Sequence, residues 1–282
     1  MVDCLIVGSG IAGISAALTL QANGRSFEIF GSSSLSTKIE KAEMIHNYPG
    51  LADVSGKQFV ARLKEQLSAA EIAVREETVG GVYAMKDKFI VQAGQNSYEG
   101  KTVVLAAGVE NVRPIKGEEE FLGRGVSYCA TCDGFLYKGK TLAIVCTSAR
   151  FEHEIEFLAG LAEKAYVFPL YKGAKIEGKN VELLKRLPSE IVGEKRVRAI
   201  VVGEEEKEVD GVFLLKESVS PAALVGGLEV SGGHVVVDRH CKTNLKGLFA
   251  AGDCTGRPYQ YAKAAGEGNV AAFSVLEFLA GR

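Results

Sequence analysis

The chain has 282 residues, of which 47% are hydrophobic and 24% are charged, and its formal net charge is -2. This composition is typical of a globular protein with room for two domains, and the near-neutral charge disfavours nucleic-acid binding. No apolar run approaches the roughly 18 residues that a membrane span needs, and the first residues carry no basic leader. We therefore expect a cytoplasmic protein that binds neither membranes nor nucleic acid.

The first residues show the strand, turn and helix order that is typical of a dinucleotide-binding site. A buried-strand pattern over residues 2–7 is followed by the turn Gly8-Ser9-Gly10-Ile11-Ala12-Gly13 and by a helix pattern from Ile14 to Ala22. Gly8 permits the turn, Gly10 lets the backbone approach a pyrophosphate, and Gly13 lets the helix pack close to the strand. The start of the helix offers free N–H groups to the phosphates.

The second predicted strand, residues 26–30, lacks the acid that usually follows such a strand and accepts the adenosine ribose hydroxyl. It runs instead into Gly31-Ser32-Ser33-Ser34. Glu28 lies inside the strand and is interpreted as an ordinary alternating position. The serine hydroxyls either replace the missing acid or belong to a flexible loop.

Two closely spaced thiols stand near the middle of the chain, in Tyr128-Cys129-Ala130-Thr131-Cys132-Asp133-Gly134. A disulfide between them can carry two electrons, and Asp133 can deliver or remove the accompanying proton. In a reducing cytoplasm such a pair is more often catalytic than structural.

A zinc site is the competing interpretation of this pair, because structural zinc needs about four soft ligands. The other cysteines are scattered singly, and none of the four histidines forms a pair at zinc-ligand spacing with a second cysteine. We therefore predict no metal site. The single cysteines are expected to be small buried fillers, at Cys4, Cys146, Cys241 and Cys254.

A second nucleotide-type pattern lies near the end of the chain. A short apolar strand within residues 247–251 ends in Gly252-Asp253, which places a carboxylate at the strand edge where open α/β sheets bind ligands. A helix pattern follows from Ala262 to Leu279. The first and last parts of the chain are thus predicted to form one domain, with the middle as an insertion.

Together these segments make the chain similar to the low-molecular-weight thioredoxin reductases over almost its full length. The matching stretches are IVGSGIAG at 6–13, IHNYPG at 45–50, LAAG at 105–108, GEEEFLGRGVSYCATCDG at 117–134 and LFAAGDCTG at 248–256. The resemblance implies an α/β fold with two nucleotide-binding-type domains. Residues 1–113 plus 246–282 would bind FAD, and residues 114–245 would form an NAD(P)H-type domain that carries the redox cysteines. It also implies a homodimer.

The resemblance assigns roles to individual residues. Cys132 would lie against the flavin, Cys129 would attack the thioredoxin disulfide, and Asp133 would be the acid. Tyr259 and Tyr261 would either stack beside the flavin or pack in the core. Besides the turn at residues 8–13, the flavin contacts implied are Asn47, Val82, Ala107, Gly108, Gly252, Asp253, Gln260 and Tyr261. Swivel connectors are implied at residues 113–117 and 244–247.

The inserted domain departs from the family in both of its NADPH-binding devices. The strand at 141–145 runs into Cys146-Thr147-Ser148-Ala149-Arg150-Phe151, which contains no glycine. The next strand, residues 165–170, ends in Phe168-Pro169-Leu170, where the family has a His-Arg-Arg type triplet. Arg150 either grips a phosphate or is a solvated charge. The domain is therefore predicted to be degenerate and not to bind NADPH.

The leading hypothesis is a flavin-dependent thioredoxin reductase that takes electrons from ferredoxin and passes them through FAD and the Cys129–Cys132 disulfide to thioredoxin. FAD suits such a donor because it accepts single electrons and delivers pairs. Three alternatives stay open: an NAD(P)H-dependent enzyme with an unusual cofactor site, a reductase for another disulfide partner, and a non-enzymatic flavin redox sensor.

Overall fold

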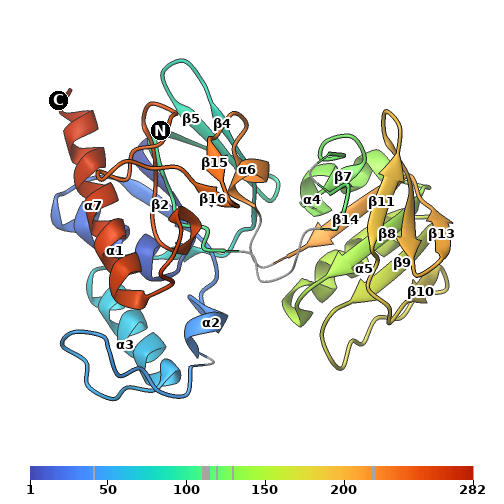
Figure 1. The fold of residues 1–282 in the computed structure, drawn as a ribbon, viewed down its shortest axis with the longest axis horizontal. Coiled ribbons are helices and arrows are strands. Elements are labelled where there is room, and N and C mark those ends of the chain that lie inside the picture. Colours follow the sequence, from blue (N-terminus) through green and yellow to red (C-terminus); the bar gives the residue numbers. More distant parts are fainter. Residues whose placement is uncertain (41, 110–114, 119, 129, 217–219, 282) are drawn as a thin grey trace. The chain divides into compact units, whose positions relative to one another are not determined.

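The computed structural model describes residues 1–40, 42–109, 115–118, 120–128, 130–216 and 220–281, without the side chains of Thr37, Lys38 and Cys132. These residues form two compact units (Figure 1). Unit 1 contains Met1–Val109 and Ser220–Arg282, and unit 2 contains Glu110–Val219. The predicted α/β fold, with one nucleotide-binding-type unit inserted into another, is confirmed.

Unit 1 is built on a seven-stranded sheet whose order is β3-β2-β1-β6-β5-β4, with β17 also paired to β6. β1 is parallel to both β2 and β6, whereas β4, β5 and β6 are antiparallel neighbours. The strands are β1 Val2–Val7, β2 Phe27–Phe30, β3 Val74–Arg75, β4 Val79–Ala84, β5 Phe89–Ala93, β6 Asn96–Leu105 and β17 Leu248–Ala250. A separate hairpin joins β15 Val230–Ser231 to β16 His234–Val235.

In unit 1 the first and last helices, α1 and α7, pack against each other through small residues. A Cβ on Gly268 of α7 would lie 2.1 Å from Ala12 O of α1, so the two helices touch at their backbones. The hydroxyl of Ser15 donates to Ala265 O at 2.7 Å across the same contact. The helices are α1 Ile11–Ala22, α2 Thr37–Glu40, α3 Gly56–Ala69, α6 Pro221–Leu224, the 3-10 turn η3 Asp253–Thr255 and α7 Tyr261–Leu279.

Unit 2 has a five-stranded parallel sheet, ordered β10-β9-β8-β14-β7, and a three-stranded antiparallel sheet, ordered β11-β12-β13. The parallel strands are β7 Val126–Ser127, β8 Thr141–Cys146, β9 Lys164–Pro169, β10 Val181–Leu183 and β14 Gly211–Leu215. The antiparallel strands are β11 Glu190–Gly193, β12 Val197–Val202 and β13 Glu205–Glu208. The helical segments are α4 Ala130–Asp133, η1 Gly134–Tyr137, η2 Ala149–Phe151 and α5 Glu152–Leu161.

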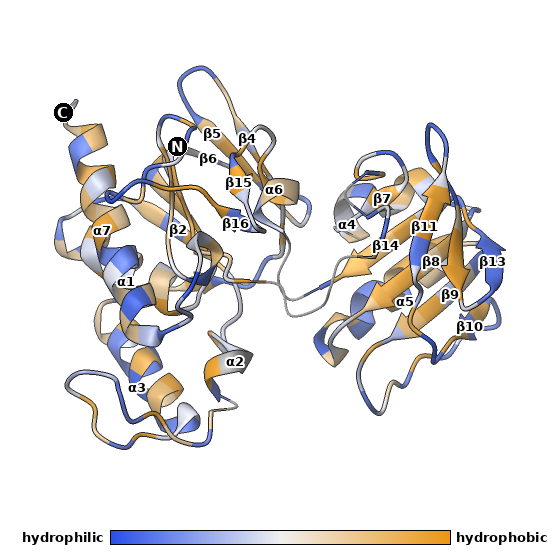
Figure 2. Cartoon of the chain, viewed as in Figure 1, coloured by the Kyte–Doolittle hydropathy of each residue, from blue (hydrophilic) through white to orange (hydrophobic). Residues whose placement is uncertain are grey.

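The hydropathy of the strands in unit 2 differs between inner and edge positions. Figure 2 shows β8, β9 and β14 of unit 2 as hydrophobic, while the edge strand β13 is hydrophilic. All five residues of β14 are buried, whereas β13 carries the sequence Glu-Glu-Lys-Glu. A charged edge strand of this kind resists pairing with a second sheet.

The second boundary between the units lies earlier than the sequence suggests. Residues 220–245 were expected in the inserted domain, but they pack in unit 1. Val225 forms a β-bridge with Val82, and Cys241 is buried in the core of unit 1. The segment holds only a four-residue helix, two-residue strands and turns, so it carries no strong periodic pattern that could have assigned it.

The expected swivel connectors change accordingly. Residues 244–247 lie inside unit 1, where the side chain of Asn244 accepts from Glu229 N and donates to Gly227 O. Of the first connector, residues 113 and 114 lie outside the described residues, while Ile115 and Lys116 belong to unit 2. The chain therefore crosses between the units at residues 109/110 and 219/220.

Candidate functional site

The turn between β1 and α1 packs tightly against the end of β6. Gly8 has a φ of +115°, and a Cβ placed on it would lie 2.2 Å from Ala106 O. A Cβ on Gly13 would lie 1.9 Å from Gly8 O. Because real Cβ atoms essentially never approach within 3.0 Å, these two positions require glycine for the fold itself.

Gly10 has a different environment. Its backbone is extended, with φ -75° and ψ -176°, and an added Cβ would meet nothing within 4 Å. It stands at the N-cap of α1, where no side chain caps the helix and no acidic residue lies in the first turn. The N–H groups of that turn have no partner within the helix, so this open space suits a pyrophosphate.

The hydroxyl of Ser9 holds the loop that follows β2. It donates to Ser32 O and to Leu35 O, each at 3.1 Å, and accepts from Ser32 N at 3.0 Å. A Cβ on Gly31 would lie 2.2 Å from this hydroxyl oxygen. The side chain of Ser9 thus links the glycine turn by hydrogen bonds to the predicted serine-rich turn.

An acidic residue that sequence reasoning missed reaches the same loop. Glu76, just beyond β3, accepts a hydrogen bond from Ser33 N at 2.8 Å. Glu28 instead pairs with Arg75 on the neighbouring strand, at 2.6 and 2.9 Å, as an ordinary strand position would. Glu76 is 43 residues from Ser33 in the sequence, and no local pattern signals that contact.

The carboxyl ends of three parallel strands meet beside the glycine turn. Leu105 of β6 is in register with both Val7 of β1 and Ala250 of β17. The turn at Gly252, which has a φ of +89°, follows directly, and a Cβ there would lie 2.9 Å from the Cβ of Ala12. The predicted flavin residues of the first and last segments are therefore neighbours.

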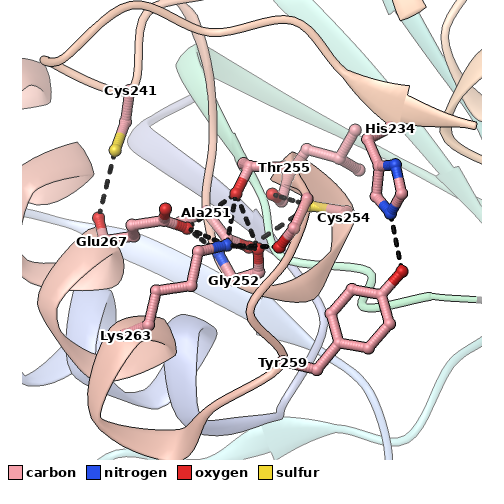
Figure 3. A network of polar contacts seen from close by, with 11 residues as sticks. His234, Cys241, Ala251, Gly252, Cys254, Thr255, Tyr259, Lys263 and Glu267 are labelled. Carbon is pink, nitrogen blue, oxygen red and sulfur yellow. Dashed lines mark hydrogen bonds and ion pairs between the residues drawn. The ribbon is translucent and has the colours of Figure 1, made fainter. Parts of the chain in front are cut away.

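A polar network on α7 braces the Gly252 turn (Figure 3). The carboxylate of Glu267 accepts from Gly252 N at 2.8 Å and from the Thr255 hydroxyl at 2.7 Å. Lys263 donates to the carbonyls of Gly252 and Gly256, at 2.9 and 2.8 Å. Asp253 lies between these anchored positions, at the first residue of η3. Lys263 and Glu267 were missed from the sequence, where they are one i, i+4 pair of a helix.

Asn47 and Gln260 are brought together although 213 residues separate them in the sequence. The Asn47 side-chain amide donates to Gln260 Oε1 at 2.9 Å. Tyr261, the next residue, packs its ring 6.0 Å from that of Phe59 and belongs to the edge of the core. Burial raises the pKa of Tyr261, and the nearby Asp253 adds to the rise. For Tyr261 the structure thus shows core packing.

Three further predicted contacts occupy different surroundings. Ala107 and Gly108 follow β6, and Gly108 has a φ of +71° with nothing within 4 Å of an added Cβ. Val82 lies in β4, which β5 separates from β6, and its side chain is only 2% exposed. Of the tyrosines near the turn, Tyr259 is 40% exposed and its hydroxyl lies 2.7 Å from His234 Nε2 (Figure 3).

The redox segment follows β7 in unit 2. Cys129 and the side chain of Cys132 lie outside the described residues, so their pairing is still a prediction. Asp133 ends the short helix α4, and its Oδ2 accepts a 2.6 Å hydrogen bond from the hydroxyl of Ser127. The predicted acid is therefore oriented from the strand that leads into the segment.

The remaining cysteines are buried free thiols, as predicted: Cys4, Cys146, Cys241 and Cys254. Cys254 donates to Leu105 O and Ala251 O at 3.4 and 3.3 Å. Among the described residues no group of three or more His, Cys, Asp and Glu side chains could hold a metal ion. No described helix is long and apolar enough to cross a membrane.

In unit 2 the turn that corresponds to the second nucleotide site bears a side chain at every position and runs through η2 into α5. Phe151 is the N-cap of α5 and only 2% exposed, and Phe168 at the end of β9 is fully buried. The first turn of α5 already holds two carboxylates, Glu152 and Glu154. Glu152 accepts from the Tyr171 hydroxyl at 2.9 Å, and burial raises the pKa of Glu154.

Arg150 does not reach into this turn as a phosphate ligand would. Its side chain is exposed, and its guanidinium lies over the Phe151 ring, 4.9 Å from the ring centroid. The arrangement is a surface cation–π contact. It matches the predicted alternative of a solvated charge.

Comparison with known proteins gives one consistent result. Residues 2–147 and 173–268 match the pyridine nucleotide-disulphide oxidoreductase family. A thioredoxin reductase from Aquifex aeolicus is 33% identical over 306 residues, covering 99% of this chain and 94% of the relative. A ferredoxin-flavin thioredoxin reductase from Clostridium acetobutylicum is 43% identical, with a TM-score of 0.92 over 99% of this chain and 98% of that one. A thioredoxin reductase from Gloeobacter violaceus is 29% identical, with a TM-score of 0.81 over 100% and 95% of the two chains.

Proposed function

The chain belongs to the low-molecular-weight thioredoxin reductases, within the pyridine nucleotide-disulphide oxidoreductases, and we propose that it reduces thioredoxin with electrons from ferredoxin. FAD is the proposed carrier in unit 1, and the Cys129–Cys132 pair is the proposed carrier in unit 2. We expect the assembled protein to be a cytoplasmic homodimer.

The observation that carries the choice of donor is the filled N-terminus of α5. A dinucleotide pyrophosphate needs bare backbone and a positive helix end. Here Phe151 occupies the N-cap, and Glu152 and Glu154 place negative charge in the first turn. A phosphate at this point would meet both a steric block and like charge. The helix dipole is already matched by the protein's own carboxylates.

The comparison with α1 sharpens this argument, because both helices follow a parallel strand of their unit. At α1 the N-cap is Gly10, open to at least 4 Å, and the first turn has no acid. At α5 the N-cap is a buried phenylalanine and the first turn has two acids. One chain thus holds one start that fits a dinucleotide and one that does not. The similar Clostridium acetobutylicum protein, whose name includes ferredoxin and flavin, supports the same donor.

The residues of unit 1 fit a bound FAD. Gly10 and the first turn of α1 would hold the pyrophosphate, and the turn at Gly252-Asp253, braced by Lys263 and Glu267, would lie beside the same helix. Asn47 and Gln260, already bonded to each other, would contribute their amides. Bound FAD supplies a group that accepts electrons singly and delivers two to a disulfide.

The thiols then complete a balanced exchange. The Cys129–Cys132 disulfide takes up two electrons and two protons and opens to a dithiol. Cys129 attacks the thioredoxin disulfide, and Cys132 then attacks the sulfur of Cys129 and releases thioredoxin with two thiols. Asp133, whose carboxylate accepts a hydrogen bond from Ser127, is the proposed acid that moves the proton at the Cys132 sulfur.

Anaerobic thiol counting tests this proposal. Photoreduced ferredoxin, this protein and oxidised thioredoxin are mixed, quenched with acid and alkylated, and the thioredoxin thiols are counted. We expect about two new thiols per thioredoxin with ferredoxin, and none when NADPH replaces it or when the Cys132→Ser variant is used. Equal yields with NADPH would restore the pyridine-nucleotide enzyme, and no thiols with either donor would refute the reductase itself.

A further inference from the structure

A buried carboxylate lies at the base of the redox segment and takes no part in the relay just described. Glu118 is 1% exposed, and Lys216 donates to its two oxygens at 2.7 and 2.9 Å. The side chains of this pair are 1% and 2% exposed, so both charges are removed from water. Every other ion pair found among the described residues has at least one side chain that is 19% exposed or more.

Two more donors converge on the same carboxylate. The hydroxyl of Tyr128 donates to Glu118 Oε1 at 2.6 Å, and Ile115 N donates to Oε2 at 2.9 Å. Each oxygen of Glu118 therefore accepts from Lys216 and from one further group. A carboxylate with this number of charge-assisted and neutral donors is held in one orientation.

The donors lie in three segments of unit 2: near the point where the chain enters the unit, near the point where it leaves, and next to the redox cysteines. Ile115 is the first described residue after the chain enters the unit, and Lys216 directly follows β14, just before the chain leaves it. Tyr128 immediately precedes Cys129. Since β7 and β14 are parallel neighbours with Ser127 in register with Phe213, Tyr128 and Lys216 both emerge at the carboxyl edge of the sheet. One carboxylate thus ties the redox segment to both ends of the inserted unit.

Stability alone does not account for this arrangement. Burying a charged pair costs about as much desolvation energy as its attraction returns, and an apolar pair of similar size is often at least as stable. What the buried ion pair provides instead is a defined geometry of the segments that bind Glu118. At the start of a thiol relay that geometry has direct value, because a misplacement of about 1 Å can slow a reaction roughly 100-fold.

We propose that Glu118 is a positioning residue for the dithiol: through Tyr128 it fixes the backbone that leads into Cys129 relative to the two ends of unit 2. The inference rests on the proposed thiol relay. It predicts that Tyr128 influences the thiols through its hydroxyl, without touching thioredoxin or flavin itself.

Tyr128→Phe tests the link most gently, because it removes one hydroxyl and leaves the ion pair in place. The matched control is Tyr171→Phe, which deletes the Tyr171–Glu152 bond elsewhere in unit 2. The measurement is the rate at which the thiols of the reduced protein react with Ellman's reagent. It is made on the flavin-bound protein and on the flavin-free protein. We expect Tyr128→Phe to stay folded and to lower that rate about tenfold, and Tyr171→Phe to leave the rate at the wild-type value.

The double variant Glu118→Gln with Lys216→Met is the second test, because it removes both charges and leaves no unpaired buried ion. One amide oxygen cannot hold all three segments, so we expect a folded protein with the slow thiol rate. Wild-type thiol rates in the double variant, or equal rates for the two tyrosine variants, would overturn the proposal. Neither readout uses ferredoxin or thioredoxin, so failure of the proposed function would appear separately, as a wild type with reactive thiols and no thioredoxin reduction.

Discussion

Gly10 is a glycine that the fold itself does not require. Its φ and ψ are open to any residue, and no described atom lies within 4 Å of the position of a Cβ. Gly8 and Gly13, in contrast, are fixed by contacts below 3.0 Å with the backbone. The difference separates glycines that build the turn from the one that leaves room for a ligand.

Gly10→Val should therefore give a folded protein that has lost its flavin. The valine side chain would occupy the space in which a pyrophosphate approaches the start of α1. We expect the purified variant to be colourless, with a melting temperature close to that of flavin-free wild type. The control is Gly160→Val, at another glycine with nothing within 4 Å, which should stay yellow. A yellow Gly10→Val protein would contradict this assignment of the pyrophosphate site.

The two redox cysteines should fail in different ways. Cys129→Ser leaves the sulfur of Cys132, which we expect beside the flavin and which should produce long-wavelength charge-transfer absorbance. Cys132→Ser leaves only the exchange thiol and should show no such band. Both variants should lose thioredoxin reduction. Wild-type turnover in either one would show that the pair does not act as a disulfide relay.

Buried thiols make stability fall at alkaline pH. Cys254 is fully buried, and burial raises the pKa of its thiol to about 12 from an ordinary 9.0. Between these pH values the unfolded chain loses a proton that the folded chain keeps, so the free energy of unfolding decreases as pH rises. The expected slope is about 1.4 kcal/mol per pH unit for each such thiol. Urea titrations at several alkaline pH values should give Cys254→Ala a shallower decline than wild type, and parallel declines would contradict the argument.

The functional residues fall into two groups: those that a local sequence motif marks, and those whose contacts join distant parts of the sequence. The glycine turn and the Gly252-Asp253 edge carry local patterns, and the structure brings them together. Glu76, Lys263 and Glu267 do their work through contacts that no local motif encodes. Cys129 and the side chain of Cys132 lie outside the described residues, so their roles rest on the sequence and the family.

At the scale of elements, α1 and α5 show how differently two strand–helix segments of one chain can begin. The strands on either side of α5 were predicted to within one residue, since their apolar pattern is clear. The two elements differ in their first turns: α5 has Phe151 at its N-cap and two acids, whereas α1 has Gly10 and no acid. Phe151 is part of the buried core of unit 2.

The α7 network gives a prediction at this scale. Glu267→Ala removes the acceptor of Gly252 N and of the Thr255 hydroxyl, so the turn that precedes Asp253 loses its brace. Losing such bonds costs about 1–3 kcal/mol, which corresponds to roughly 5- to 150-fold weaker flavin binding. Fluorescence titration of the apoprotein with FAD measures the affinity. Glu277→Ala, at an exposed pair on the same helix, is the control and should bind as wild type does; equal affinities of the two variants would rule out the bracing role.

At the scale of the whole molecule, the chain consists of two units, and the proposed function assigns the flavin to one and the dithiol to the other. The insertion itself was predictable, because nucleotide-type patterns begin and end the sequence. The return point was not, because residues 220–245 contact the rest of unit 1 through single bridges and side-chain bonds. The choice of electron donor is the property that depends on both units together.

Anaerobic stopped-flow spectroscopy of the flavin, with no thioredoxin present, tests that choice most directly. The oxidised holoprotein is mixed with NADPH in one experiment and with reduced ferredoxin in the other, over a series of salt concentrations. We predict that NADPH leaves the flavin oxidised for minutes, while ferredoxin bleaches it at a rate that falls as salt screens the encounter. Rapid, saturable bleaching by micromolar NADPH would contradict the account and make the filled start of α5 irrelevant to the donor.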